Sequence, residues 1–290
     1  MKKVVYMVVV LLLTFNMVNA KVSKKEKHVL LDLYHSTNGA HWIKKWNLKA
    51  PVSSWYGIKI QDGHVVEINL FKNNLMGKLP KSIGTLTHLK KLNLAFNSIT
   101  GELPLAIVEL QELNILKLEM NRLKGEIPAT IGYLDNLQEL TMFNNFISGS
   151  IPESIGEIAG LKVLNLSSNN LRGAIPSSIG DLAELQILGL FQNSLFGSIP
   201  NEIGKLGNLK ELVLANNKLN GAIPEEFGQL ASLEVFQIQN NDFNSFNSLK
   251  NMDTRQFLVF DTDLEVKQED FKDINFSNSR MADTKFDDEE

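Results

Sequence analysis

Residues 161–184 read LKVLNLSSNNLRGAIPSSIGDLAE, and the chain repeats this pattern at a constant interval. The shared form is LxxLxLxxNxLxGxIPxxIGxLxx, and its asparagine returns every 24 residues without a slip. A glycine follows four residues later and a proline seven residues later in all but the last unit. The asparagines in register are Asn73, Asn97, Asn121, Asn145, Asn169, Asn193, Asn217 and Asn241. A fixed period of this length predicts stacked repeats.

Each position of the unit has a physical task. Leu164 and Leu166 alternate as in a short strand with one buried face. The other apolar residues of the unit lie too far apart for one strand, so the chain must coil to bring them into one interior. Stacked coils place successive strands in a parallel sheet at ~4.8 Å spacing. The asparagine falls where the strand ends and the chain bends, and a ladder of its amides can satisfy backbone groups that the bend leaves unpaired.

A single coil cannot bury its apolar edges, so both ends of the stack need caps. Ser23-Lys24-Lys25-Glu26 has the form of a capping box and predicts a helix that ends before Asn38-Gly39. Three tryptophans follow, and their rings can cover the first coil: Trp42, Trp46 and Trp55. At the other end the pattern fades after Asn241, which predicts a C-terminal cap over 245–265.

These repeats resemble the plant-type leucine-rich-repeat family, most closely in LNLSSNNLRGAIPSSIG and LVLANNKLNGAIPEEFG. The resemblance covers about 66–244, and the segment LLDLYHSTNGAHWIKKW resembles the helical cap of the family. It implies an α/β solenoid, a right-handed curved superhelix of about eight 24-residue repeats with a concave parallel sheet. Members include receptor-kinase ectodomains, polygalacturonase-inhibiting proteins and secreted bacterial surface proteins. Plant members usually carry paired cysteines in the cap, whereas this chain has Val52, Ser53 and Ile60 there.

The N-terminal segment of the chain suggests an exported protein. Lys2 and Lys3 precede an apolar run and small residues up to Ala20, which predicts a signal peptide of bacterial style cleaved near Ala20. The expected domains are therefore the signal peptide at 1–20, a helical and tryptophan-rich cap at 21–65, repeats at 66–244, a C-terminal cap at 245–265 and an acidic, flexible tail at 266–290. We expect a secreted, periplasmic or cell-surface location, with no membrane span after signal removal.

Composition excludes several classes of function. Hydrophobic residues make up 43% and charged residues 21%, which is typical of a folded protein. A net charge of −4 argues against nucleic-acid binding through a broad basic surface. The absence of cysteine removes disulfides and thiolate chemistry. The five histidines show no metal-ligand spacing, and no nucleophile or phosphate-loop motif is present. We therefore expect no enzyme activity, no catalytic residue, no metal site and no cofactor.

The candidate ligand-binding residues come from strand positions six, four and two residues before each asparagine, which should face the concave side. The minus-two positions include Phe71, Phe143 and Phe191. Exposed aromatic rings on such a face are typical binding anchors. Further candidates are Lys117, four residues before its asparagine, and Phe96 and Met120, each one residue before its asparagine. The alternative is that phenylalanine simply suits a half-exposed sheet.

The resemblance implies a recognition module rather than a catalyst. We expect a monomer that binds a protein or peptide, with a carbohydrate as an open possibility. Two other readings remain: an inhibitor of an extracellular polysaccharide-degrading enzyme, and a structural or adhesive surface protein.

Overall fold

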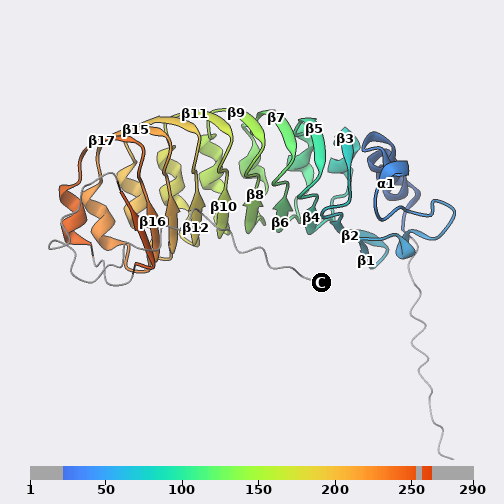
Figure 1. The fold of residues 1–290 in the computed structure, drawn as a ribbon. Coiled ribbons are helices and arrows are strands. Elements are labelled where there is room, and N and C mark those ends of the chain that lie inside the picture. The colour runs from blue at the N-terminus through green and yellow to red at the C-terminus, as the bar shows by residue number, and fades with distance from the viewer. Residues whose placement is uncertain (1–21, 253–256, 263–290) are drawn as a thin grey trace, which may run out of the picture.

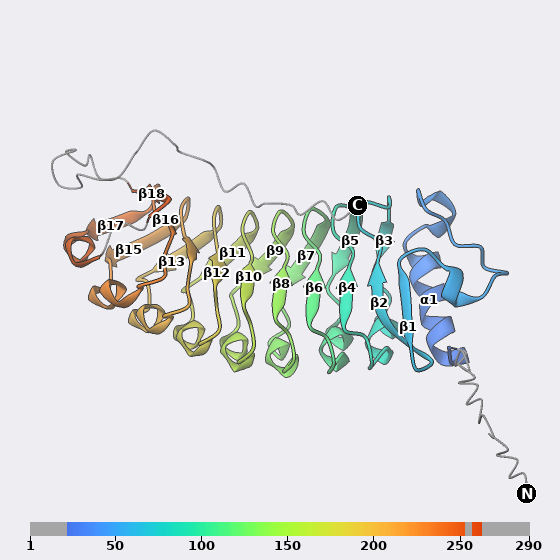
Figure 2. The same ribbon diagram turned by 90° about the horizontal axis from the view of Figure 1, so that it is seen from below.

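The computed structural model describes residues 22–252 and 257–262, which form one elongated stack of coils (Figure 1). The expected signal peptide and acidic tail lie outside the described residues. A parallel-sheet solenoid is confirmed, with one turn of the chain for each 24-residue unit. The stack bows gently, and a ten-stranded sheet follows its inner side (Figures 1 and 2).

The ten-stranded sheet is parallel except for the hairpin at its N-terminal end, where β1 pairs antiparallel with β2. Each later strand pairs in register with its counterpart 24 residues away, as Leu164 does with Leu140 and Leu188. The strands in spatial order are β1 (Ile58–Gln61), β2 (His64–Asn69), β4 (Lys91–Asn93), β6 (Ile115–Lys117), β8 (Glu139–Thr141), β10 (Val163–Asn165), β12 (Ile187–Gly189), β14 (Glu211–Val213), β16 (Val235–Gln237) and β18 (Val259–Asp261).

A second sheet, which the sequence analysis did not anticipate, runs along the solenoid behind the first one. It has eight parallel strands, formed by the residues that follow each ladder asparagine. In spatial order they are β3 (Met76–Lys78), β5 (Ser98–Glu102), β7 (Arg122–Glu126), β9 (Phe146–Gly149), β11 (Asn170–Gly173), β13 (Ser194–Gly197), β15 (Lys218–Ala222) and β17 (Asp242–Ser245).

Short 3-10 helices complete each coil and begin after the repeat prolines in most units. Those of the repeats and the C-terminal cap are η3 (Lys81–Thr85), η4 (Leu105–Glu109), η5 (Ile131–Tyr133), η6 (Glu153–Glu157), η7 (Ser177–Asp181), η8 (Asn201–Lys205), η9 (Glu225–Gln229) and η10 (Asn247–Asn251). The repeat leucines and isoleucines that form the core point into the space between the sheets and these helices. Most of them are fully buried, so the core is one continuous apolar column.

The asparagine side chains hold consecutive coils together. The Asn145 amide Nδ2 lies 3.0 Å from the Leu118 carbonyl oxygen of the preceding unit and 3.1 Å from that of Met142 in its own unit. Its Oδ1 accepts from the backbone N–H of Leu123 at 2.9 Å. The same donor and acceptor pattern repeats at Asn121 and Asn169. These bonds pair backbone groups that the bend would otherwise bury without partners.

The N-terminal cap consists of α1 (Lys24–Ser36), η1 (Gly39–His41) and η2 (Val52–Ser54). The rings of Trp46 and Trp55 stack at 4.7 Å, and Trp42 meets Trp46 edge-on at 4.8 Å. All three rings are buried, and each indole N–H donates to a backbone carbonyl. Aromatic packing with satisfied N–H groups therefore organises this cap, which contains no cysteine.

The capping box of α1 is half formed. Ser23 Oγ accepts from the backbone N–H of Glu26 at 3.1 Å, as the motif predicts. The Glu26 carboxylate instead turns toward the repeats, where it is buried and lies 3.1 Å from His64 Nδ1. Contact with His64 at the start of β2 thus replaces the reciprocal bond that the sequence alone would suggest.

At the other end, the apolar segment before β18 packs onto the last repeat. The rings of Phe236 and Phe260 lie 5.8 Å apart, and Phe257 stacks on Phe260 at 5.3 Å. These rings cover the C-terminal end of the leucine core.

The variant Asn145→Leu tests how much the asparagine ladder contributes to stability. This change removes the partners of a backbone N–H and several carbonyls in the middle of the stack, and we expect a loss of about 1–3 kcal/mol in the free energy of unfolding. Urea unfolding measures it. Asn170→Leu, at an exposed position of β11, is the matched control and should leave stability nearly unchanged. Equal midpoints of urea unfolding for the two variants would contradict a structural role for the asparagine ladder.

Candidate binding surface on the ten-stranded sheet

The inner face of the ten-stranded sheet carries the candidate residues, and it is less open than the sequence pattern suggests. Side chains six residues before the asparagines are half-buried throughout. The minus-four positions are mostly buried, including Asn93, Thr141 and Val213. The expectation of three solvent-facing columns is therefore wrong for the minus-four column.

Local hydrogen bonding explains part of this difference. The Oδ1 atoms of Asn93 and Asn165 accept from the backbone N–H two residues ahead, at 3.1 Å in both cases. Such turns fold the amide back onto its own strand end. The Asn165 side chain also occupies the space over Gly189, where a Cβ atom would meet its Oδ1 at 2.7 Å. Side chains therefore cover one another along the face.

The aromatic candidate residues lie at several positions along the inner face. Phe71 is 38% exposed, and its ring lies 5.1 Å from that of Phe96, so these two form an aromatic pair at the N-terminal end. Phe143 and Phe191 are half-buried and follow strands β8 and β12, so one strand lies between them.

Phe96 and Met120 occupy an unusual backbone conformation. The residue before each ladder asparagine has a positive φ, with values of 57° at Phe96 and 55° at Met120. The six other units place Asn, Ser, Gln or Lys there. Left-handed backbone is unfavourable for large side chains, and such strain is enriched at functional sites. Because every repeat bends here with a positive φ, the conformation belongs to the coil and does not by itself mark Phe96 or Met120 as binding residues.

Charged residues gather on the N-terminal half of the face. Glu67 accepts from Lys59 at 2.7 Å and lies 3.7 Å from Lys91. Lys117, the charged candidate, pairs with Glu139 at 2.9 Å. The opposite charges within these pairs largely neutralise one another.

Glu119 is an exception among the carboxylates because it is buried, with 6% of its surface exposed. Thr141 Oγ1 donates to its Oε2 at 2.5 Å. Burial raises the pKa of the Glu119 carboxyl, while the Thr141 hydrogen bond and the Lys117 charge oppose that rise. Sequence analysis missed this residue because its position was assigned to a solvent-facing column.

Strands β10 and β12 form a different region of the face. Their side chains are uncharged, with half-buried Val163 and Ile187 beside Asn165 and the bare backbone of Gly189. The inner face thus carries paired charges near the N-terminal cap and an uncharged, partly apolar surface at β10 and β12.

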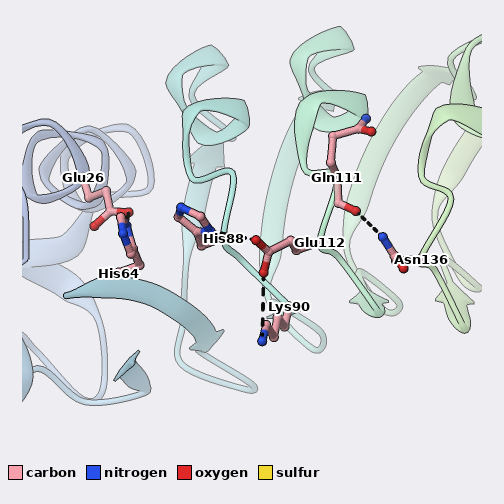
Figure 3. A network of polar contacts seen from close by, with 7 residues as sticks. All are labelled: Glu26, His64, His88, Lys90, Gln111, Glu112 and Asn136. Atoms are coloured by element: carbon pink, nitrogen blue, oxygen red, sulfur yellow. Dashed lines mark hydrogen bonds and ion pairs between the residues drawn. The ribbon is translucent and has the colours of Figure 1, made fainter. Parts of the chain in front are cut away.

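The histidines form no candidate metal centre within the described residues. His64 and His88 come together with their ring centroids 3.9 Å apart, a contact that sequence analysis missed (Figure 3). His88 Nδ1 lies 2.7 Å from Glu112, which is also 4.0 Å from Lys90. With the Glu26–His64 contact, these residues make a polar bridge from the cap helix across the first repeats.

His35 and His41 make local contacts within the N-terminal cap. The His35 ring lies against Tyr34, and His41 Nδ1 lies 2.8 Å from Asn38 Oδ1. Neither contact suggests catalytic chemistry.

The described geometry defines a leucine-rich-repeat solenoid, and comparisons with known proteins agree. The family profile "Leucine-rich repeat region" matches residues 69–171, and "Leucine Rich Repeat" matches 208–230. The chain therefore belongs to the leucine-rich-repeat family, and its repeats are of the plant type. No curated protein is similar to the chain at a significant level.

Solved structures similar to the chain include several plant receptor-kinase ectodomains. The ectodomain of GASSHO1/SCHENGEN3 from Arabidopsis thaliana, in complex with CASPARIAN STRIP INTEGRITY FACTOR 2, is 32% identical over 81% of this chain and 29% of its own, with a TM-score of 0.77. PEPR1 with AtPEP1 is 31% identical over 83% and 35%, with a TM-score of 0.72.

The Arabidopsis receptor kinase HAESA, with the peptide hormone IDA and the co-receptor SERK1, is 27% identical over 83% of this chain and 46% of its own, with a TM-score of 0.61. The chain thus spans between about a third and a half of the length of these ectodomains. In the described part of the chain, no helix is long and apolar enough to cross a membrane.

The burial of Glu119 predicts a pH-dependent contribution to stability. Because its pKa is raised in the folded state, its contribution is fully present below the usual value of 4.5 and is lost as pH rises through the folded value. The variant Glu119→Gln keeps this position neutral at every pH. The stability of the variant, relative to that of the unchanged protein, should therefore rise from about pH 4 to neutral pH. Urea unfolding at both pH values measures the difference, and a difference independent of pH would contradict this prediction.

Proposed function

We propose that the chain is an exported, non-catalytic recognition module that binds an extended peptide or protein segment on the inner face of the ten-stranded sheet. The observation that carries this proposal is the aromatic and partly apolar character of that face, which no other described segment covers. Figure 2 looks onto this sheet along its whole length.

The distribution of side chains favours an elongated ligand. Phe71 and Phe96 lie at one end, Phe143 and Phe191 further along, and the uncharged strands β10 and β12 extend the surface. Aromatic side chains provide large contact areas at low entropy cost and are frequent binding anchors. The paired charges near Lys117 and Glu67 can fix the register of a polar end of the ligand.

The similar solved structures support this class of ligand. Two of them are receptor ectodomains whose structures contain the named factor CASPARIAN STRIP INTEGRITY FACTOR 2 and the peptide hormone IDA. Extracellular recognition also fits the signal peptide that the sequence predicts. The domain boundaries given above, a secreted or cell-surface location and a monomeric state belong to the same proposal.

The test is capture by the mature chain, residues 21–290, from the extracellular and surface extract of its source. The variant Phe71→Ala/Phe143→Ala/Phe191→Ala should lose the bound peptide or protein while retaining its melting temperature, because these rings lie on the sheet surface rather than in the leucine core. Mass spectrometry identifies the bound species, and calorimetry with the purified ligand measures the loss of affinity.

The matched control is Tyr133→Ala/Phe146→Ala/Phe196→Ala, which removes three exposed aromatic rings from other faces. It should bind the same ligand with unchanged affinity. Equal loss in both variants, or unchanged binding in the first, would refute the assignment of the inner face.

A further inference from the structure

The N-terminal end of the solenoid carries a large share of the positive charge of the chain. Residues 33–101 contain nine lysines and two acidic residues, a net charge of +7. Residues 102–262 contain ten basic and nineteen acidic residues, a net charge of −9. The two acids of the first region lie away from the end of β2, because Asp62 is in the turn before β2 and Glu67 lies between Lys59 and Lys91.

Aromatic rings and lysines come together where β2 ends. Lys44 Nζ lies 5.8 Å from the centre of the Tyr56 ring, and the rings of Phe71 and Phe96 lie 5.1 Å apart. Asn73 connects the cap loop to this bend, since its Oδ1 accepts from the backbone N–H of Lys44 at 2.6 Å. We call this surface the cap patch, and its residues are Lys44, Tyr56, Phe71, Lys72 and Phe96.

The cap patch is open to solvent. Tyr56 and Phe71 are 46% and 38% exposed, and Lys44, Lys45 and Lys72 are exposed as well. Within the described residues, none of these three lysines forms an ion pair with an acidic side chain. Exposed aromatic rings beside such cations indicate an interaction surface for a partner with carboxylates and an apolar side chain.

The chain itself contains a segment with this chemistry. Residues 263–290, which lie outside the described residues, contain ten acidic and four basic residues, a net charge of −6. Five of the acids fall within 263–273 and five within 283–290. In the second group, Phe286 directly precedes the run Asp287-Asp288-Glu289-Glu290, so one aromatic ring stands beside four carboxylates.

The parallel sheet brings the start of this segment to the same edge as the cap patch. Asp261 of β18 is the register partner of Gln237, and the same register continues strand by strand to Asn69 of β2. The chain therefore leaves β18 at the edge where Phe71 and Lys72 follow β2. Strands β2 and β18 are eight intervals apart along the sheet (Figure 2). At ~4.8 Å for each interval, the separation is about 38 Å.

This distance separates the two groups of acids. An extended chain covers at most ~3.6 Å per residue, so Asp270, eight residues beyond Thr262, reaches no further than about 29 Å. Phe286 is 24 residues beyond Thr262 and can reach about 80 Å. The run that begins at Phe286 can therefore contact the cap patch with slack, whereas the first acids of the segment cannot.

We propose that residues 286–290 bind the cap patch of the same chain. The four carboxylates pair with Lys44, Lys45 and Lys72, and the Phe286 ring packs against the aromatic pair of the patch. Attachment through β18 gives the segment an effective concentration in the millimolar range, so a weak contact is sufficient. The acidic charge of residues 102–262 repels the same run from the later repeats.

The bound run occupies Phe71 and Phe96, which belong to the candidate peptide surface. A ligand from outside must displace it to reach these two rings. This consequence rests on the proposed function, whereas the contact within the chain does not.

The experiment measures a distance in the mature chain, residues 21–290, by pulsed electron spin resonance. Because the chain has no cysteine, Ser53→Cys and Thr284→Cys give two unique sites for spin labels. Ser53 is exposed on the cap, three residues before Tyr56. We expect a narrow distribution below about 30 Å, whereas an unattached segment gives a broad distribution centred near ~45 Å. Sodium chloride at about 1 M should broaden the narrow distribution, because it screens the ion pairs.

Two variants of the labelled chain remove the two sides of the contact. Asp287→Asn/Asp288→Asn/Glu289→Gln/Glu290→Gln and Lys44→Gln/Lys45→Gln/Lys72→Gln should each replace the narrow distribution by the broad one. The matched controls are Asp263→Asn/Glu265→Gln/Glu269→Gln/Asp270→Asn, which neutralises four acids of the same segment, and Lys162→Gln/Lys205→Gln/Lys210→Gln, which removes three exposed lysines of the later repeats. Both controls should keep the narrow distribution, and thermal melts should show that all variants are folded.

A tenfold excess of unlabelled chain distinguishes a contact within one chain from a contact between two copies. The narrow distribution should survive this dilution, and its loss would assign the run to a second copy and overturn the proposal. A broad distribution in the labelled chain without further changes, or equal effects of the test and control variants, would also overturn it. No peptide ligand takes part in these measurements, so their failure leaves the proposed function untouched.

Discussion

Every coil of this protein depends on pairing the backbone where the chain leaves the inner sheet. A bend at that point buries carbonyl and N–H groups that no strand can reach. One asparagine amide in each unit pairs several of them, as Asn145 does with Leu118, Leu123 and Met142. Because two of these three partners belong to the preceding coil, the same bonds that close one bend also fix the distance and rotation to its neighbour.

The bend also shapes both surfaces. The residue before each asparagine is held at a positive φ, which turns the chain out of the inner sheet. The residues after the asparagine then form the second sheet. The strained backbone of Phe96 and the exposure of Phe146 therefore follow from one local geometry, repeated along the solenoid. Nearest-neighbour contacts of this kind are the source of stability in repeat proteins.

Much of the fold could be predicted from the sequence, because a fixed spacing of Leu164, Leu166 and Asn169 allows few ways to bury the apolar side chains. The tryptophan cap could also be anticipated, since large rings must be buried. The second sheet could not, because its short strands alternate polar and apolar residues for only three to five positions, which is too few to distinguish a strand from a turn.

The details of the candidate site depended on contacts between distant residues. Glu26 fits a capping box locally, yet its carboxylate turns to His64, 38 positions away. Glu119 occupies a position assigned to solvent, but neighbouring strands bury it. The folding back of Asn165 over Gly189 likewise depends on the adjacent coil. The sequence period specifies which face a residue lies on, whereas the exposure of its side chain depends on the side chains of the next coil.

The exact 24-residue register has a consequence for how such a protein can change during evolution. Duplication or loss of one whole coil adds or removes a strand in both sheets at once, while the amide contacts on either side of the junction re-form unchanged. The two sheets therefore have the same repeat length, and neither can lengthen without the other. The side chains of the two surfaces, by contrast, can change independently. Phe143 and Phe146 lie only three positions apart in the chain, yet they belong to different surfaces.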